Sequence, residues 1–76
     1  MTPQQERNAK FESVFKAGGI NTRRVKCLGS FVHIDTFEKY EDKINQVMGS
    51  LGAKLLMAEN GVHMDGVNGF RLVYKF

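Results

Sequence analysis

The spacing of hydrophobic residues changes within the segment 31–52, and this change organises the chain. The segment opens as a strand, and hydrophobic residues then recur every three or four positions: Phe37, Tyr40, Ile44, Val47, Met48 and Leu51. This spacing places them on one face of an α-helix, opposite a polar face. We expect this helix to begin at Asp35 or Thr36, with Glu38 completing a capping box, and to end at Gly52.

A second amphipathic segment lies at the N-terminus. Thr2 can cap a helix, Pro3 suits its first position, and Gln5 completes a capping box. A narrow hydrophobic stripe follows: Phe11, Val14 and Phe15. The Gly18–Gly19 pair then favours termination, since glycine tolerates left-handed geometry. The pattern predicts a helix over residues 3–17.

Residues 22–28 alternate between polar and apolar, and the following Gly29–Ser30 dipeptide is typical of a two-residue hairpin turn. If Leu28 pairs with Phe31, one hairpin face carries only apolar residues: Val25, Cys27, Val32 and Ile34. The other face is mostly polar: Arg24, Lys26, Leu28, Phe31, His33 and Asp35. A slip of one residue would mix the two faces, so this segregation supports the register. The register also sets Arg24 opposite Asp35 as a favourable charge pair.

The C-terminal third is rich in strand patterns. Residues 54–59 read as a strand, and Asn60–Gly61 reads as a turn. Residues 62–69 fit either a short strand ending at Asp65–Gly66 or a long flexible loop. The final segment is the clearest strand, with Phe70, Leu72, Tyr74 and Phe76 on one face and Arg71, Val73 and Lys75 on the other.

These elements predict an α+β fold in the order helix, hairpin, helix and two or three further strands. The strand-helix-strand unit over residues 31–59 would place its two strands parallel in one sheet. The simplest architecture is a two-layer α/β sandwich with a mostly antiparallel sheet and both helices on one face. This layout resembles that of ferredoxin-like modules, although the aromatic signature of RNA-recognition sheets is missing.

Composition narrows the class of protein. The chain has 76 residues and 42% hydrophobic content, which suits a single small globular domain. Its net charge of +3 weakly favours anionic partners. Cys27 is the one cysteine, the N-terminus is too polar for a signal peptide, and no apolar run is long enough to span a membrane. We therefore expect a cytoplasmic protein without membrane contact.

The sheet face away from the helices is the main candidate surface. It would combine cations with an exposed ring, the composition with which sheets bind single-stranded nucleic acid. With the basic run at 21–26, the candidate residues are Arg23, Arg24, Lys26, Phe31, His33, Arg71 and Lys75. Two plainer interpretations stay open: an ordinary solvated face with Phe31 covered by the first helix, and a basic run that merely follows a helix stop.

Signals for catalysis or metal binding are weak. The potential ligands match no zinc spacing: Cys27, His33, His63 and Asp65. Cys27 is expected in the core, where a thiol is inert and points away from His33. The Glu41–Asp42 pair lies on the exposed side of its helix, and so small a chain has little room for an enclosed pocket. We expect no enzyme, no cofactor and no metal.

The sequence therefore favours a small non-enzymatic binding module that contacts nucleic acid through a basic sheet face. The alternative is a protein-binding module or inhibitor, of the kind found among phage and plasmid accessory proteins, that docks on a larger protein or nucleoprotein complex. The first helix, or the terminal strand if it is a sheet edge, could also build a homodimer.

Overall fold

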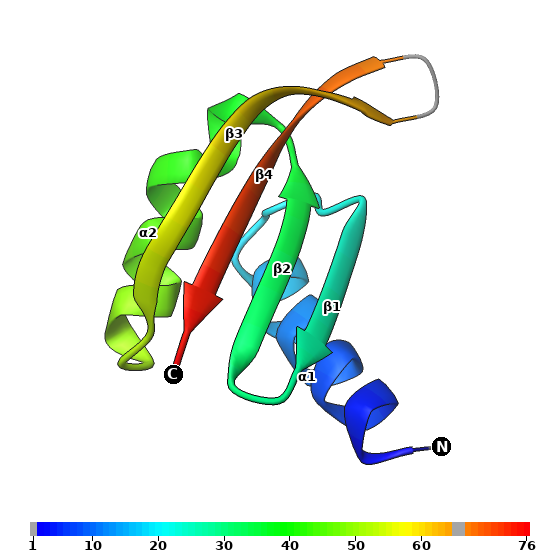
Figure 1. The fold of residues 1–76 in the computed structure, drawn as a ribbon, viewed down its shortest axis with the longest axis vertical. Coiled ribbons are helices and arrows are strands. Elements are labelled where there is room, and N and C mark those ends of the chain that lie inside the picture. Colours follow the sequence, from blue (N-terminus) through cyan, green and yellow to red (C-terminus); the bar gives the residue numbers. More distant parts are fainter. Residues whose placement is uncertain (1, 65–66) are drawn as a thin grey trace.

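The computed structural model describes residues 2–64 and 67–76. Two helices, α1 and α2, lie behind one antiparallel sheet of four strands (Figure 1). The elements are α1 (Pro3–Ala17), β1 (Arg24–Leu28), β2 (Phe31–Thr36), the 3-10 helix η1 (Glu38–Tyr40), α2 (Glu41–Ser50), β3 (Lys54–Met64) and β4 (Val67–Lys75). The predicted α+β sandwich and the order α-β-β-α-β-β are confirmed, with both helices on the same face.

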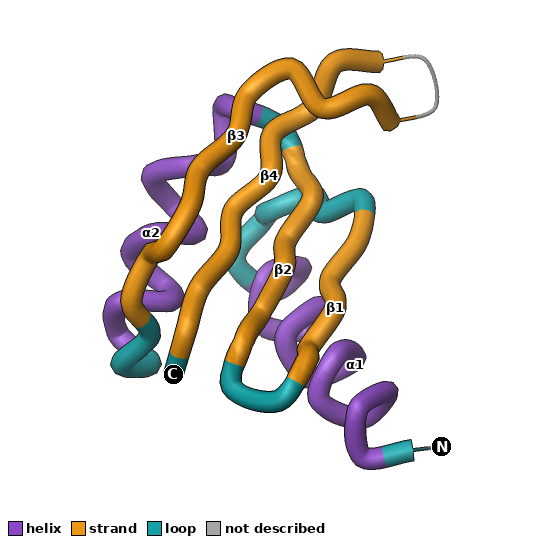
Figure 2. Tube along the Cα trace, in the orientation of Figure 1, coloured by secondary structure: helices purple, strands orange, loops and turns teal. Residues whose placement is uncertain are grey.

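The strands are arranged in the order β1-β2-β4-β3, and each neighbouring pair is antiparallel (Figure 2). Because β4 lies between β2 and β3, those two strands run parallel without pairing with each other. The predicted parallel unit is thus present as a split β-α-β, as in ferredoxin-like modules. The possibility that the terminal strand is a sheet edge is excluded, because β4 is a central strand. β4 carries the most buried hydrophobic residues of any strand, and a central strand is shielded on both sides.

The N-terminal half folds as its sequence predicts. The Gln5 backbone N–H donates to Thr2 Oγ1 at 3.2 Å, and the Thr2 N–H donates to Gln5 Oε1 at 3.0 Å, which completes the capping box of α1. The hairpin register is the predicted one, with Leu28 opposite Phe31. Its apolar face is buried beneath the helices, so a slip of one residue would bury charged side chains instead.

The second helix begins later than predicted, and its predicted capping box is absent. Asp35 and Thr36 are buried residues of β2. The Thr36 hydroxyl donates to the Asn21 carbonyl at 2.6 Å, and Asp35 accepts from Arg71 at 2.7 Å. Both hydrogen bonds join residues that are distant in sequence. They engage the Asp35 and Thr36 side chains, so neither is available to cap the helix. The chain turns through η1 before α2 begins at Glu41.

Strand β3 is longer than predicted, because the Asn60–Gly61 dipeptide does not form a hairpin turn. Gly61 has a φ of 83°, and the pairing with β4 shifts between Asn60 and Val62. The dipeptide therefore makes a bulge, where glycine supplies the left-handed conformation. The strand continues to Met64, so the alternative of a long loop over 62–69 is wrong. The turn predicted at 65–66 lies outside the described residues.

One hydrophobic core fills the space between the helices and the sheet. Its buried members are Phe15, Ile20, Val25, Cys27, Val32, Ile34, Ile44, Met48, Phe70, Leu72 and Tyr74. The Tyr74 hydroxyl donates to Asn45 Oδ1, which ties β4 to α2. Burial, aided by the charge of Glu41, raises the pKa of Tyr74 to about 12. Two residues expected on apolar faces remain partly outside the core, Leu51 and Phe76.

Phe15 should anchor α1 to the sheet. Its side chain is fully buried, whereas the neighbouring Val14 is 38% exposed. We expect Phe15→Ala to lower the free energy of unfolding by about 3–5 kcal/mol, because it leaves a cavity in the core. Val14→Ala should lower it by less than about 1 kcal/mol. Urea denaturation followed by circular dichroism measures both, and equal effects would show that α1 is not docked through Phe15.

The Tyr74 hydroxyl gives a pH-dependent test of the contact between β4 and α2. Its pKa is about 12 in the folded chain, against 10.0 ordinarily, so the folded state holds this proton more tightly than the unfolded state. The resulting stabilisation is complete below pH 10 and is lost as the pH rises toward 12. We expect the wild-type chain to lose stability over this range more steeply than Tyr74→Phe in urea denaturation. Parallel losses would contradict the assignment.

Candidate functional site

The sheet face opposite the helices is open among the described residues (Figure 1). Directly opposite residues of paired strands share a face, so the registers place side chains in rows across it. The first row is Leu28, Phe31, Lys75 and Lys54. The second row is Lys26, His33, Val73 and Met57. The third row is Arg24, Asp35, Arg71 and Glu59.

Positive charge predominates on this open face. Its three rows contain five basic side chains and two acidic ones, besides His33. The acidic residues both lie in the third row, where charges of opposite sign alternate from strand to strand. The first row has two lysines and no acid, so unbalanced positive charge is greatest there and at Lys26.

An ion pair organises the third row. Arg71 Nε donates to Asp35 Oδ1 at 2.7 Å, and the Asp35 side chain is 10% exposed against 36% for Arg71. The hydrogen bond to Asp35, and then its negative charge, raise the pKa of the Arg71 guanidinium. Arg24 lies opposite Asp35 as predicted, yet Asp35 bonds Arg71 on the other neighbouring strand. The charge of Arg71 is therefore partly balanced within the chain.

A shallow hollow of about 240 Å³ lies over β1, β2 and β4. Its lining is Arg24, Lys26, Leu28, His33, Asp35 and Arg71. Four of the seven residues singled out from the sequence thus meet at one place. Guanidinium, ammonium and imidazole groups around a hollow offer several N–H donors to an anion, and arginine can bind a phosphate through two of them.

Phe31 and Lys75 form a second part of the same face, next to the hollow. Phe31 is 39% exposed, and Lys75 Nζ lies 5.8 Å from the centre of its ring. The alternative that the first helix covers Phe31 is wrong, because α1 packs on the opposite side of the sheet. A base that stacked on this ring would also meet a cation.

Arg23 lies apart from the other candidate residues. It precedes β1 and lines a separate hollow of about 360 Å³ together with Glu12, Lys16, Ile20, Asn21 and Thr22. Conversely, sequence reasoning missed Lys54, which the structure places opposite Lys75. No local signal could have found it, since the residues opposite 54–59 depend on which strand lies beside β3.

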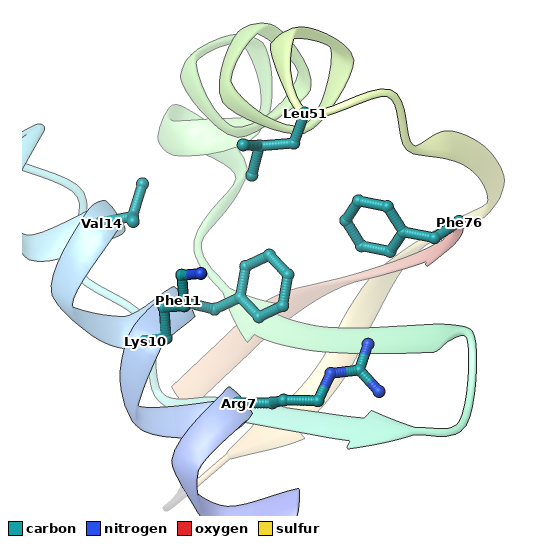
Figure 3. Close-up of a pocket in the computed structure, with 6 residues that line it drawn as sticks. All are labelled: Arg7, Lys10, Phe11, Val14, Leu51 and Phe76. Atoms are coloured by element: carbon teal, nitrogen blue, oxygen red, sulfur yellow. The ribbon is translucent and has the colours of Figure 1, made fainter. Parts of the chain in front are cut away.

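The helix layer carries a different hollow, of about 290 Å³, between α1, the end of α2 and the C-terminus (Figure 3). Its lining is Arg7, Lys10, Phe11, Val14, Leu51 and Phe76. The ring centroids of Phe11 and Phe76 are 5.8 Å apart. Leu51 projects toward these rings from the end of α2 (Figure 3). This is where the core reaches the surface between the two helices.

The described residues contain little that resembles a reaction centre. Cys27 is buried, and that burial raises the pKa of its thiol, with Arg7 opposing the shift, so it is a poor nucleophile. No three His, Cys, Asp or Glu side chains of the described chain gather as metal ligands would. Of the potential ligands named from the sequence, Asp65 and the side chain of His63 lie outside that part. Neither described helix is long and apolar enough to cross a membrane.

The ion pair between Asp35 and Arg71 should support both the fold and the site. We expect Arg71→Met to lower the free energy of unfolding by about 1.5–3 kcal/mol, because it leaves a largely buried carboxylate without its partner. In an Asp35→Asn background the same substitution should cost much less. Urea denaturation of the two single variants and the double variant measures this coupling. Additive effects would contradict a functional pair.

Comparison of the chain with protein-family models, curated proteins and solved structures finds no match.

Proposed function

We propose that this chain is a small, cytoplasmic, non-enzymatic module that binds single-stranded nucleic acid on the open face of its sheet. The observation that carries the proposal is the hollow bounded by Arg24, Lys26, His33 and Arg71, next to the exposed pair of Phe31 and Lys75. Cations that bind phosphates and a ring that stacks on a base are the two parts that such modules combine.

The shape of the face favours a single strand over a duplex. The major groove of DNA is about 12 Å wide and admits a helix or a two-stranded ribbon. Four strands spaced about 4.8 Å apart make a broader surface, and the helices behind it prevent insertion edge-on. A single strand can instead lie across the rows, with a base on Phe31 and phosphates near the cations.

The charges on the face differ in what they can contribute. Arg71 is held by Asp35, so its main contribution would be to fix one wall of the hollow. Arg24 and Lys26 are two positions apart on β1, so both lie on the open face, about 6.8 Å apart along the strand. Lys54 and Lys75 are opposite each other on β3 and β4 and add charge beside Phe31.

Binding of fluorescently labelled single-stranded RNA and DNA tests the proposal. Anisotropy should show binding that weakens as salt increases, because phosphate contacts release counterions. Arg24→Glu with Lys26→Glu should abolish it, and the milder Arg24→Gln with Lys26→Gln should reduce the slope of log K against log salt by about 1.4. Phe31→Ala should weaken binding by about 1–3 kcal/mol through lost stacking.

The matched control is Lys39→Glu with Lys43→Glu. It makes the same change in net charge away from the open face, at one exposed lysine in η1 and one in the first turn of α2, where an acidic residue suits the helix dipole. This variant should bind almost as well as the wild type. An equal loss in both double variants would show attraction to overall charge without a site on the sheet. Absence of binding by every oligonucleotide would contradict the proposal outright.

A further inference from the structure

The two edges of the sheet differ in how they are covered. β1 is one edge and β3 is the other. Along β1, Asn8 of α1 places its Oδ1 2.7 Å from the backbone N of Cys27 and accepts that hydrogen bond. Arg7 of the same helix donates to the Gly29 carbonyl in the hairpin turn. α1 therefore covers the β1 edge, which is one way proteins keep an edge from pairing.

The edge of β3 has free backbone groups, and the pairing shows which ones. The Phe76 N–H donates to the Ser30 carbonyl at 2.9 Å, so even-numbered residues near the end of β4 direct their backbone groups toward β2. Odd-numbered residues of β4 then bond to β3, where they face Lys54, Met57 and Glu59. By the same alternation, Leu55 and Ala58 direct their N–H and C=O groups away from β4.

The side chains of this edge are hydrophobic where those groups are free. Leu55, Leu56 and Met57 are exposed and consecutive, and Ala58 follows them. The positively charged Lys54 precedes this run, and the negatively charged Glu59 follows it. Within the described chain, no side chain caps the outward groups in the way that Asn8 caps β1. The run from Leu55 to Ala58 has neither a charge nor a proline, so its free backbone groups are a template for another strand.

We propose that two copies of this chain pair along β3, antiparallel, about a twofold axis between Leu56 and Met57. In this register Leu55 faces Ala58 of the second copy, so outward backbone groups meet outward backbone groups. Leu56 faces Met57, so apolar meets apolar. Lys54 faces Glu59, so opposite charges meet. Each pair occurs twice, as a twofold interface requires.

The bulge in β3 makes this register consistent with the faces of the sheet. Leu55 pairs with Tyr74 and Met57 with Val73, so Leu56 is the inserted residue and lies with Met57 opposite Val73. In a regular strand, residues 54 and 59 would lie on opposite faces. With one inserted residue, Lys54 and Glu59 both lie on the open face, and Leu55 and Ala58 both lie on the helix side. The twofold pairing therefore matches faces throughout.

The paired sheets would form one continuous sheet with the open faces of both copies on the same side. Lys54 and Lys75 of each copy would then lie near the junction. This inference rests on the edge of β3 and does not depend on the proposed binding of nucleic acid. The experiments below measure the mass of the chain in solution without any oligonucleotide, so either proposal can fail while the other stands.

Sedimentation equilibrium of the full chain is the first test, and we expect a monomer–dimer equilibrium. Leu56→Lys should shift it to monomer, whereas Leu51→Lys should leave it unchanged. Leu51 is the matched control, because its side chain is 47% exposed against 49% for Leu56. It lies at the end of α2, away from the proposed interface. A wild-type chain that stays monomeric at its highest soluble concentration would overturn the proposal. So would a dimer that Leu51→Lys disperses and Leu56→Lys does not.

Ala58→Pro tests the backbone pairing itself. Proline removes an N–H that β4 does not use, and proline is tolerated on an edge strand in that position. Circular dichroism should show a folded chain, and sedimentation should show a monomer. A folded Ala58→Pro chain that still dimerises would overturn pairing through β3.

A charge exchange tests the register. Lys54→Glu alone and Glu59→Lys alone each replace two attractive pairs by two repulsive ones, so each variant should dimerise about tenfold more weakly than the wild type. An equimolar mixture of the two variants restores opposite charges at both positions, and native mass spectrometry should show the heterodimer in preference to either homodimer. A random mixture of the three dimers would overturn this register.

Discussion

The burial of alternate residues in β2 and β4 is the constraint on which the rest of the structure depends. Val32 and Ile34 of β2 and Leu72 of β4 are fully buried beneath the helices. Each such side chain contributes about 1.5–3 kcal/mol by leaving water. Because side chains alternate, a slip of one residue would replace these side chains in the core by their neighbours, which include His33, Asp35 and Arg71. The same alternation that fills the core therefore gathers the cations on the opposite face.

The Asp35–Arg71 pair shows how local and distant interactions compete for one side chain. Asp35 is three residues before Glu38, which is the spacing of a capping box, and an isolated peptide could use it so. In the folded chain Asp35 is nearly enclosed in β2 and bonds a guanidinium on β4. A largely buried carboxylate needs a partner more than an exposed helix needs a cap, so the strand extends and the helix starts later. The extension also places Asp35 in the wall of the hollow.

The two edges of the sheet differ, because α1 hydrogen-bonds to β1, whereas in the described part of the chain the backbone groups on the outer side of β3 are free. A domain of this size buries a modest share of its surface, and α1 adds to that share while it covers β1. Among the described residues α2 contacts β3, yet none of its side chains hydrogen-bonds the outward backbone groups of that strand. A continuous run of exposed hydrophobic residues on such an edge is unusual for a chain that stays alone, and this is the basis of the proposed pairing through β3. The open face, by contrast, is mostly polar, with eight of its twelve row positions occupied by charged residues or His33.

Local patterns by themselves determined the bounds and capping of α1, the register of the first hairpin and the two faces of residues 70–76. In each case either the contacts that decide the feature join residues close in sequence, or the period of the hydrophobic pattern is enough to predict it. Only the tertiary structure decided that β4 inserts between β2 and β3, that Asn60–Gly61 is a bulge, that Lys54 joins the basic face and that β3 is the free edge. Those features depend on which strands pair and in which register, and one of these pairings joins β2 to the distant β4. The physical reason is that periodicity states which side of a strand is buried, whereas it carries no information about which strand lies beside it.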